Sequence, residues 1–584
     1  MGKIIGIDLG TTTSEIAYIK NGKPELIVDR NGNRIIPSVT GIDDYGNIIN
    51  GEGAANQIEA YPERTIAEVK RLIGKDQKVK LGDKAFLPHE ISAELLKELK
   101  NYAETYLGEE VTEAVITVPA NFNNSQRKLT KQAGELAGLK VDRIINEPTA
   151  AAMAYGIDNL DKEEKVLVYD LGGGTFDVTI LEMFDGILDV MSSRGNNKLG
   201  GKDFDERIEK YILDEFKKQY GVDLYEISDT SMIHHIKGSI KNASISAKKE
   251  LSTKNTTSIN IPFITVIDNK PVTLSVGITR EKFDELTKDL VDATEKTIDE
   301  ALDAANCTED DIDVVLLVGG SSRIAAVQKL VNTKFPNKVK TGINPDEAVA
   351  LGAAVQAGIK RDLISSEDSL IVTDKSSYSL GTSVTAEIGG RVVSGLFDCL
   401  IPRDSSIPCS RKKSYITIYD NQTEVDIDIY EGDAPIVWEN TKIADFKLSG
   451  IPEGPAGTEG IEIEFNYDLN GILEVKATIS STRKSITKIV DNFELEKSLN
   501  SDDTKSNQQI PDTDINLEIW KDCSLAVNVK NTIDLTERKM EKLQQSEIEK
   551  LQILINKLKK AVIDGNEELV EQYDEELTDI LFDM

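Results

Sequence analysis

Two copies of one short pattern constrain the fold of this chain more than any other feature. Residues 4–12 read IIGIDLGTT and residues 166–177 read VLVYDLGGGTFD, so each is an apolar strand that ends in an aspartate, Asp8 or Asp170, before a Gly/Thr turn. A third stretch, residues 314–323 (VVLLVGGSSR), also runs from a strand into glycines. Backbone N–H groups of such turns bind phosphate, and the aspartate can hold the accompanying metal ion. One glycine-rich turn is commonly only a turn, but the matched set predicts a duplicated α/β unit that closes on one nucleotide.

Composition limits the class of protein. At 584 residues the chain is too long for one hydrophobic core and predicts about two to four domains. Its 68 basic and 101 acidic side chains give a net charge of −33, which repels nucleic acid and anionic membranes. No apolar run reaches the length of a membrane span, and the first strand begins at Lys3, which leaves no room for a signal peptide. The cysteines are scattered without a CxxC pair. We therefore expect a cytoplasmic protein without nucleic-acid or membrane partners.

Hydrophobic periodicity divides the chain into segments. Residues 1–365 alternate strands and amphipathic helices, which is typical of an α/β domain. Residues 366–374 form a linker that is polar except for an apolar centre, and residues 375–495 change to period two. We expect a flexible linker over residues 496–513 and a helical segment over residues 514–584. The expected strands of the α/β domain are 4–8, 114–118, 166–170 and 314–318, and its expected helices are 91–106, 125–137, 203–219, 281–305 and 346–358.

The last third of the chain predicts an antiparallel β-domain followed by helices. Residues 425–429 and 461–465 alternate strictly between apolar and polar side chains, and Asn470-Gly471 then turns the chain into a further alternating strand, a hairpin signal. Beyond it, apolar stripes at helical spacing predict a helical hairpin, with a coiled-coil dimer as the alternative. The stripes comprise Met540, Leu543, Leu551, Leu554, Leu558 and Val562, then Leu569, Tyr573, Leu577 and Ile580.

The residues of the three loops suit phosphoryl transfer, which needs positioning and charge neutralisation more than covalent chemistry. Asp8 and Asp170 would face each other across a cleft and hold Mg²⁺ through its waters. Pro148 is favoured at the first position of a helix and places Glu147 at the helix mouth, where a carboxylate can be catalytic or only a cap. Lys70 alone reads as a surface lysine.

The same segments closely resemble the 70-kDa heat-shock chaperones of the DnaK type. The motifs occur in the family's order, closely over residues 1–360, more loosely over 375–480, and hardly at all beyond. The resemblance implies an actin-like (ribonuclease H-like), two-lobed ATPase domain, then a β-sandwich that binds peptides and a short helical lid. The matching motifs are IGIDLGTT, VITVPANF, RIINEPTAAAMAYG, YDLGGGTFD, LGGKDFD, LLVGGSSR and NPDEAVALGAAVQ.

The resemblance also implies a site for ATP or ADP with Mg²⁺. Asp8, Asp170 and Asp177 would surround the hydrated metal ion, and Lys70, acting with Glu147, would orient the attacking water, so the implied catalytic set is Lys70, Glu147, Asp170 and Thr175. The implied nucleotide contacts are Gly10, Thr11, Thr12, Gly172, Gly173, Gly174, Thr175, Gly200, Gly201, Lys248, Lys249, Ser252, Gly319, Gly320, Ser321, Arg323 and Asp346. Ile245 departs from the family, which usually has a glutamate there, and we expect a weaker grip on the ribose.

Further matches imply how the two domains communicate. Pro119 and Arg127 resemble the relay between nucleotide state and domain docking, although Asn121 replaces an aromatic residue and Asn124 an aspartate. Arg143 matches the position that engages J-domain co-chaperones. The linker centre Leu370-Ile371-Val372, with Asp374 after it, resembles the hydrophobic interdomain linker, and burying its three apolar side chains would contribute about 4–8 kcal/mol at most.

The β-domain would then hold an extended apolar segment of an unfolded protein by main-chain hydrogen bonds and one side-chain pocket. Val425 and Ile427 match one strand of that pocket, Tyr415 and Ile418 its neighbour, and Ile418 replaces a smaller residue. Taken together, the resemblance implies an ATP-dependent chaperone, mainly monomeric, whose weak ATPase is stimulated by peptide and by a J-domain partner. A nucleotide-exchange factor is a further expected partner, and the short lid indicates a divergent paralogue.

Two other classes of function compete with this reading. A sugar kinase or an actin-like filament protein shares the nucleotide fold, but neither is expected to continue through an apolar linker into a β-domain. A nucleotide-regulated exchange factor or holdase that barely hydrolyses ATP is the third class. The presence of Lys70, Glu147 and Thr175 argues against it.

Overall fold

The structure is a computed structural model in which the chain divides into two units, Met1–Leu495 and Glu496–Met584. It describes residues 2–490, apart from residues 59, 76, 227–229, 268–269, 343, 366–369 and 389–390, together with isolated residues between 533 and 577. The predicted flexible linker at 496–513 lies outside the described residues. None of the helices described is long and apolar enough to cross a membrane.

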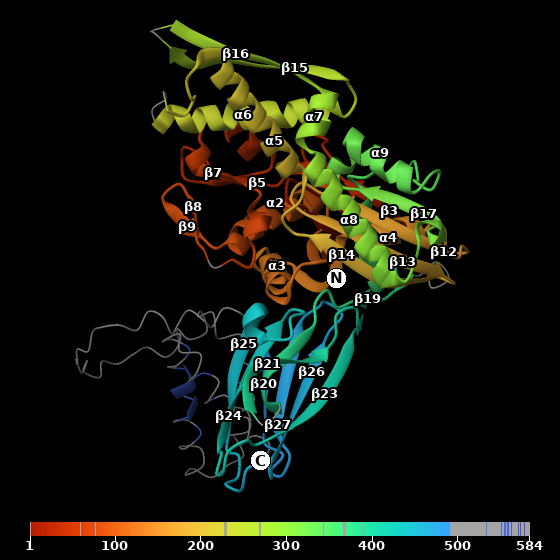
Figure 1. Ribbon diagram of the computed structural model, residues 1–584, viewed down its shortest axis with the longest axis vertical. Helices are drawn as coiled ribbons and strands as arrows, with labels where there is room; N and C mark the ends of the chain where they lie inside the picture. The colour runs from red at the N-terminus through yellow and green to blue at the C-terminus, as the bar shows by residue number, and fades with distance from the viewer. Residues whose placement is uncertain are drawn as a thin grey trace, which may run out of the picture. The chain divides into compact units, whose positions relative to one another are not determined.

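The first half of the α/β domain, lobe I (red to orange in Figure 1), is built on a mixed sheet. Its strand order is β11-β10-β1-β2-β3, to which β4 adds by pairing with β2. Its strands are β1 (Lys3–Leu9), β2 (Thr13–Lys20), β3 (Lys23–Ile27), β4 (Ile36–Pro37), β10 (Val111–Val118) and β11 (Lys140–Asn146). Two smaller sheets hold β5 (Val39–Ile42), β6 (Ile48–Asn50), β7 (Thr65–Ala67), β8 (Val79–Leu81) and β9 (Lys84–Phe86). The helices and 3₁₀ turns of this half are α1 (Glu52–Gln57), η1 (Pro62–Arg64), η2 (Val69–Leu72), α2 (Pro88–Leu107), α3 (Asn124–Leu136) and α4 (Glu147–Gly156).

The second half, lobe II, repeats the arrangement with the strand order β17-β12-β13-β14-β18. Its strands are β12 (Glu164–Leu171), β13 (Phe176–Phe184), β14 (Ile187–Asn196), β17 (Val314–Val318) and β18 (Ile371–Val372), and a separate hairpin joins β15 (Thr256–Ile267) to β16 (Lys270–Thr279). Its helices and 3₁₀ turns are α5 (Gly201–Tyr220), α6 (Thr230–Leu251), α7 (Arg280–Leu286), α8 (Lys288–Ala305), η3 (Glu309–Asp311), η4 (Gly320–Arg323), α9 (Ala325–Lys334) and α10 (Ala348–Lys360).

The predicted duplication is present in the strand pairing. In lobe I the antiparallel pair β1–β2 sets Asp8 opposite Glu15, and in lobe II the pair β12–β13 sets Asp170 opposite Asp177. Each first strand also pairs in parallel with a later one, β1 with β10 and β12 with β17. The two glycine-rich turns are therefore hairpin turns at equivalent edges of two sheets, which is why both aspartates reach one cleft.

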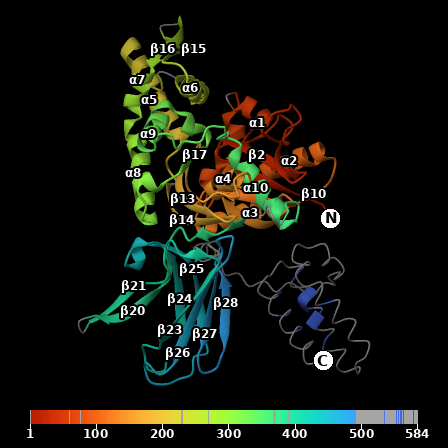
Figure 2. The same ribbon diagram turned by 90° about the vertical axis from the view of Figure 1, so that its right-hand side faces the viewer.

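Helices α4 and α10 lie side by side (Figure 2), and their backbones approach so closely that no side chain fits at Gly352. A Cβ atom on Gly352 would lie 1.7 Å from the carbonyl oxygen of Ala150, and one on Gly6 would lie 2.2 Å from the backbone nitrogen of Ala354. This explains the run of small residues in both helices, because larger side chains would push apart α4, α10 and the sheet that bears Asp8.

Among the differences between the predicted and the observed elements are two in the helices of lobe II. The helix expected over 281–305 is two helices, α7 and α8, because Thr287 leaves the helical conformation and its buried hydroxyl donates to the carbonyl oxygen of Phe283. Helix α6 was missed, although its buried residues Ile236, Ile240, Ala247 and Leu251 recur at helical spacing.

The β-domain consists chiefly of two antiparallel sheets, with the orders β21-β20-β24-β25 and β23-β26-β27-β28. One hydrophobic core, which includes Ile427, Ile429, Phe465 and Val475, contains buried residues of both sheets, as alternating strands predict. The predicted hairpin joins β26 to β27 through residues 468–472, with Gly471 at a positive φ of 68°. The elements are β19 (Asp374–Lys375), β20 (Leu380–Ile388), β21 (Arg391–Ile401), β22 (Ser406–Ile407), β23 (Cys409–Ile416), β24 (Glu424–Glu431), η6 (Val437–Glu439), β25 (Thr441–Ser449), β26 (Gly460–Tyr467), β27 (Leu473–Ile479) and β28 (Ser485–Ile489).

In the second unit, several members of the predicted apolar stripes are both helical and buried. They are Leu551, Leu554, Leu558, Val562 and Leu577. Tyr573 is helical and partly buried, and the remaining members Met540, Leu543, Leu569 and Ile580 lie outside the described residues. The boundaries proposed for the β-domain, linker and lid remain predictions.

Candidate nucleotide site

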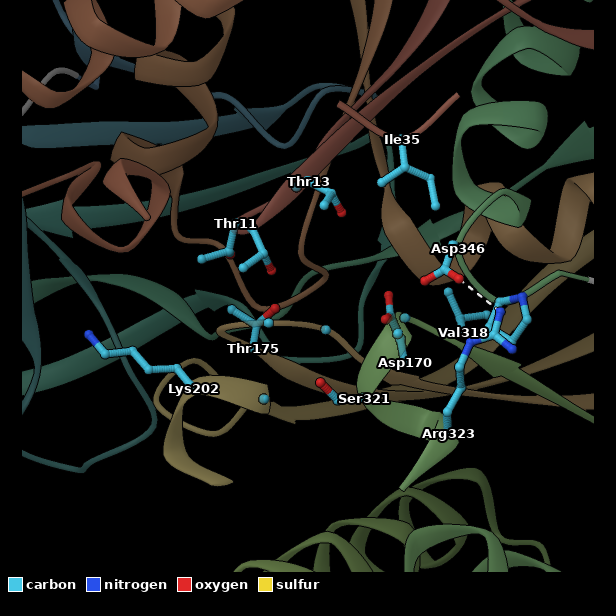
Figure 3. A pocket seen from close by; sticks show the side chains of 18 of the residues that line it. Thr11, Thr13, Ile35, Asp170, Thr175, Lys202, Val318, Ser321, Arg323 and Asp346 are labelled. Carbon is cyan, nitrogen blue, oxygen red and sulfur yellow. Dashed lines mark hydrogen bonds and ion pairs between the residues drawn. The ribbon is translucent and has the colours of Figure 1, made fainter. Parts of the chain in front are cut away.

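A cavity of about 720 Å³ lies between the two lobes, and the three glycine-rich loops line it (Figure 3). Thr11 comes from the turn of lobe I, Thr13 from the start of β2, Thr175 from the matching turn of lobe II, and Ser321 from η4. The sequence-predicted residues in its wall are Asp8, Gly10, Thr11, Thr12, Lys70, Glu147, Asp170, Gly172, Gly173, Thr175, Gly201, Lys248, Lys249, Ser252, Gly319, Gly320, Ser321, Arg323 and Asp346. The predicted residues Gly174, Asp177 and Gly200 are not in the wall.

The glycines are required because the loops touch. A Cβ atom on Gly173 would lie 1.9 Å from the hydroxyl oxygen of Thr12, and one on Gly200 would lie 2.5 Å from the backbone nitrogen of Gly174. A Cβ atom on Gly319 would lie 2.4 Å from the carbonyl oxygen of Leu171. Glycine at these positions therefore allows the backbones of the three loops to converge on one space, and such convergence of backbone amides suits a phosphate chain.

Lys70 and Glu147 form a buried ion pair at the base of the cavity. The Lys70 Nζ to Glu147 Oε1 distance is 2.5 Å, and Lys70 is 4% exposed. Lys70 is held on η2. Glu147 begins α4, so Pro148 is the second residue of the helix and not, as predicted from the sequence, the first. A buried, charge-assisted pair of this kind can hold and polarise a water molecule.

Carboxyl groups crowd around this lysine. Burial, with the charge of Glu147, raises the pKa of Asp8 to about 6, and the same causes, with the charges of Asp177 and Asp8, raise the pKa of Asp170. Oδ2 of Asp170 is buried and has no hydrogen-bond partner. Mutual repulsion among these groups falls when a cation is present, so the donor set fits a divalent metal ion. No group of three or more His, Cys, Asp or Glu residues, among those described, is arranged to hold a metal directly.

Asp177 lies behind the cavity wall and is held by the chain before α3. Its Oδ1 accepts a hydrogen bond of 2.5 Å from Nδ2 of Asn121, and its Oδ2 accepts one of 3.3 Å from the backbone nitrogen of Ala120. Burial nevertheless raises the pKa of Asp177 to about 7. The sequence flagged Asn121 only as a departure from the family, and its hydrogen bond to Asp177 was not foreseen.

The part of the cavity expected to hold adenosine is formed by α6, η4 and the start of α10. Nζ of Lys248 donates to Oδ2 of Asp205 at 2.7 Å, and Arg323 pairs with Asp346 at 2.8 Å (Figure 3). Ile245 faces the same cavity. Sequence reasoning missed further wall residues, among them Glu15, Ile35, Glu68, Lys202 and Asp205.

The residues predicted to couple the two domains lie where the α/β domain contacts the β-domain. The Arg127 guanidinium donates to the carbonyl oxygens of Ala120 and Phe122 and to Oδ1 of Asn146, and Nδ2 of Asn146 donates to Asp374 at 2.7 Å. Pro119 accepts at its carbonyl oxygen from the backbone nitrogen of Phe122.

Two further contacts join α3 and β11 to the turn and strand that follow β26. Oδ1 of Asn124 accepts from the backbone nitrogen of Leu473 at 2.9 Å, and Arg143 donates to the carbonyl oxygen of Leu469 at 2.6 Å. The aspartate-to-asparagine departure at Asn124 thus falls on a direct contact with the β-domain.

The linker prediction needs one correction. Leu370 is buried at 4% exposure beside Gly156, but Ile371 is 63% exposed and Val372 is only partly buried. Ile371 and Val372 form β18, which pairs in parallel with Ile187 and Leu188 of β14, and the side chains of a strand alternate between faces. The energy of burying three apolar side chains was therefore overestimated, because the strand turns the middle one outward.

The residues predicted for peptide binding lie on β23, β24 and the loop between them. Ile427 is buried in the core of the β-domain, while Tyr415 and Val425 are partly buried against it. Ile418 is 45% exposed, and the hydroxyl of Tyr415 donates to Asp398 at 2.8 Å. Their role in peptide binding stays a prediction.

Fold and site together define a class: a two-lobed α/β domain with a phosphate-type cleft, joined in one unit to an antiparallel β-sandwich. The family model described as Hsp70 protein matches residues 4–80 and 76–584. The chain belongs to the Hsp70 family. This membership confirms the predicted family and fold class. ATP binding, ATP hydrolysis and ATP-dependent chaperone function are the properties of that family.

Relatives named chaperone protein DnaK are similar over most of this chain. Those of Thermotoga maritima and Thermotoga petrophila are each 46% identical over 490 residues, which cover 83% of this chain and 80% of theirs. The DnaK of Thermosipho melanesiensis is 42% identical over 569 residues, which cover 96% of this chain and 92% of that protein.

Proposed function

We propose that ATP and Mg²⁺ in the cleft between the lobes control the binding and release of extended apolar segments of unfolded proteins in the β-domain. The nucleotide supplies the phosphoryl group that is transferred to water. Side chains and backbone groups of this chain perform every other part of the mechanism.

Each residue set of the cleft has one task in this proposal. The amides and hydroxyls of the two hairpin turns bind and orient the phosphate chain, and the carboxylates of Asp8 and Asp170, with Asp177 behind them, would hold the hydrated metal ion. Lys70, with Glu147 at 2.5 Å, holds a water molecule in line with the phosphate.

The observation that carries the coupling is the path from the linker into the cleft. The linker strand β18 pairs with β14 and so extends the sheet that carries Asp170. Next to it, Asp374 accepts from Asn146, the residue directly before Glu147. A change in how the lobes close over the nucleotide can therefore alter linker docking, since a coupling of about 1–3 kcal/mol suffices to shift such an equilibrium.

The finer partners are part of the same proposal. We assign to Arg143 a role in engaging a J-domain co-chaperone, and Tyr415, Ile418, Val425 and Ile427 to the peptide site. A nucleotide-exchange factor acts on the lobes, and the protein works mainly as a monomer. The similarity to DnaK proteins supports these assignments.

A chaperone that binds nucleotide but barely hydrolyses it is the competing candidate. The buried Lys70–Glu147 pair favours hydrolysis over this alternative, because burying two charges is costly and a holdase has no use for a water-positioning pair. A kinase or filament protein has no use for the β-sandwich.

The test is single-turnover ATP hydrolysis by the full chain, with and without an unfolded apolar peptide and a J-domain. We expect each addition to raise the rate and both together to raise it further. Robust hydrolysis that ignores both additions would remove the proposed coupling.

A Lys70→Ala variant separates binding from chemistry. We expect it to bind ATP but to lose at least about a hundredfold in the hydrolysis rate, the scale expected for a preorganised electrostatic group. Lys329→Ala, on the surface of α9, is the matched control and should hydrolyse ATP like the wild type. Wild-type hydrolysis by Lys70→Ala would refute the site assignment.

A further inference from the structure

Glu68 is an unexpected wall residue of the nucleotide cavity. It directly precedes η2, the turn that carries Lys70, and it adopts a left-handed backbone conformation with φ of 62°. A residue other than glycine held in that conformation costs on the order of 1 kcal/mol, so the contacts of its side chain must compensate for the strain.

The carboxylate of Glu68 reaches two lysines of the opposite lobe. Its Oε1 lies 2.6 Å from Nζ of Lys241, on α6, and its Oε2 lies 3.0 Å from Nζ of Lys202, on α5. The Glu68 side chain is 12% exposed and each lysine side chain 35%. Attraction to Lys241 and Lys202 lowers the pKa of Glu68 despite its burial.

Both lysines lie on elements that build the cavity. The backbone nitrogen of Lys202 donates to the carbonyl oxygen of Gly173, in the phosphate-type turn, and Lys202 itself is in the cavity wall (Figure 3). Lys241 lies two helical turns before Lys248 and Lys249 on α6. Glu68 therefore connects lobe I to both helices of the facing wall.

A second contact joins the same turn, η2, to lobe II across the cleft. Arg71 donates to Oδ2 of Asp203 at 2.9 Å and to the carbonyl oxygen of Gly174 at 2.7 Å. In lobe I, η2 packs against α2, and the carbonyl oxygen of Ile73 accepts from Gln126 of α3. Lys70 thus sits between two connections from lobe I to lobe II.

An isolated, solvent-exposed ion pair would carry no such role, because its contribution is about 0–1 kcal/mol. The Glu68 contact differs in having two cations, low exposure and a strained backbone. We propose that Glu68 is a positioning residue that clamps lobe II over the nucleotide and sets the rate at which nucleotide leaves. This inference rests on the proposed nucleotide-binding function of the cleft.

The experiment is stopped-flow release of ADP that carries a fluorescent group, from the full chain with Mg²⁺. We expect Glu68→Gln to release it roughly three- to tenfold faster than the wild type, because the amide cannot hold either lysine as an ion pair. Lys202→Gln and Lys241→Gln each remove one of the two ion pairs and should give smaller increases in the release rate. Glu215→Gln is the matched control, since it breaks a 2.6 Å ion pair with Lys218 within α5 and should leave release unchanged.

Two further readouts separate a clamp from a general loss of structure. Raising salt from about 0.05 to about 0.5 M should speed release from the wild type but hardly from Glu68→Gln, because salt screens the ion pairs. The triple variant Glu68→Lys, Lys202→Glu and Lys241→Glu restores opposite charges and should return the release rate toward the wild-type value.

The results of these experiments separate the proposed clamp from the proposed nucleotide-binding function. Wild-type protein that binds no ADP would contradict the nucleotide site itself. ADP binding with release from Glu68→Gln, Lys202→Gln and Lys241→Gln all at the wild-type rate would overturn the clamp alone. If Glu68→Gln does not fold, the two lysine variants decide the question.

Discussion

The side-chain amide of Asn121 donates a 2.5 Å hydrogen bond to Oδ1 of Asp177, while the backbone carbonyl of the same asparagine accepts one from the hydroxyl of Tyr378. Tyr378 lies just beyond the linker, on the β-domain side. Ala120 makes a parallel connection, since its nitrogen donates to Asp177 and its carbonyl oxygen accepts from Ser377. Two adjacent residues therefore contact both a carboxylate proposed for the metal site and the start of the β-domain.

We predict that Asn121→Ala weakens Mg²⁺-dependent ADP binding by about 1–3 kcal/mol. The lost hydrogen bond favours the charged form of Asp177, so its removal raises the pKa of a carboxyl group already raised to about 7 and leaves less carboxylate near neutral pH. Calorimetric titration of ADP with and without Mg²⁺ measures this change. Asn332→Ala removes an exposed amide of α9 and serves as the control. Equal affinities for wild type and Asn121→Ala would contradict the assignment.

Gly195 makes the Asn121–Asp177 contact possible. A Cβ atom there would lie 2.0 Å from Oδ1 of Asp177 and 2.3 Å from Nδ2 of Asn121. We expect Gly195→Ala to lower the free energy of unfolding by about 1–3 kcal/mol through overpacking and to reduce ADP affinity. Denaturant unfolding and ADP titration measure the two effects. The control is Gly277→Ala, whose added methyl group meets nothing within 4 Å, and a similar result for the two variants would count against the close packing.

Two adjacent residues of the linker differ in burial, and substitutions at each can be compared. Leu370→Ala removes a buried side chain that lies beside Gly156 in one hydrophobic core with Leu188, whereas Ile371→Ala removes a side chain that is 63% exposed. We expect Leu370→Ala to cost about 2–4 kcal/mol in linker docking and to abolish stimulation of the ATPase by peptide, and Ile371→Ala to change either by little. Steady-state ATPase assays and proteolysis at the linker test this. Equal effects of the two variants would show that the alternation along β18 is not what decides docking.

A pH effect is expected from Glu431, whose carboxyl group is buried at the end of β24. Burial raises its pKa from 4.5 to about 7, while a 3.5 Å contact with the backbone nitrogen of Asn124 and the charge of Arg127 act in the opposite direction and Asp433 adds to the rise. Because the buried pKa is the higher one, the carboxyl group binds its proton more tightly when buried. Its stabilising contribution is complete below about pH 4.5 and is lost as the pH rises through about 7.

Glu431→Gln should therefore flatten the pH dependence of stability between pH 5 and 8 and raise stability at pH 8 by about 1–3 kcal/mol. Thermal unfolding of the full chain across this range measures the effect. Glu424→Gln lies on the same strand, exposed and paired with Lys447, and should leave the pH profile as it is in the wild type. Parallel profiles for wild type and Glu431→Gln would remove Glu431 as the titrating group.

The sequence by itself determined the twin strands, their terminal Asp8 and Asp170, the glycine turns and the change to period two near residue 375. These features are local, because alternation and turn residues depend on neighbours a few positions away. Only the tertiary structure decided that Lys70, an ordinary surface lysine by its local pattern, is 4% exposed against Glu147. It also decided that Glu68 meets Lys202 and Lys241 and that Ile371 faces outward. Such contacts join residues far apart in the chain and exist only because two lobes pack face to face, which no local pattern encodes.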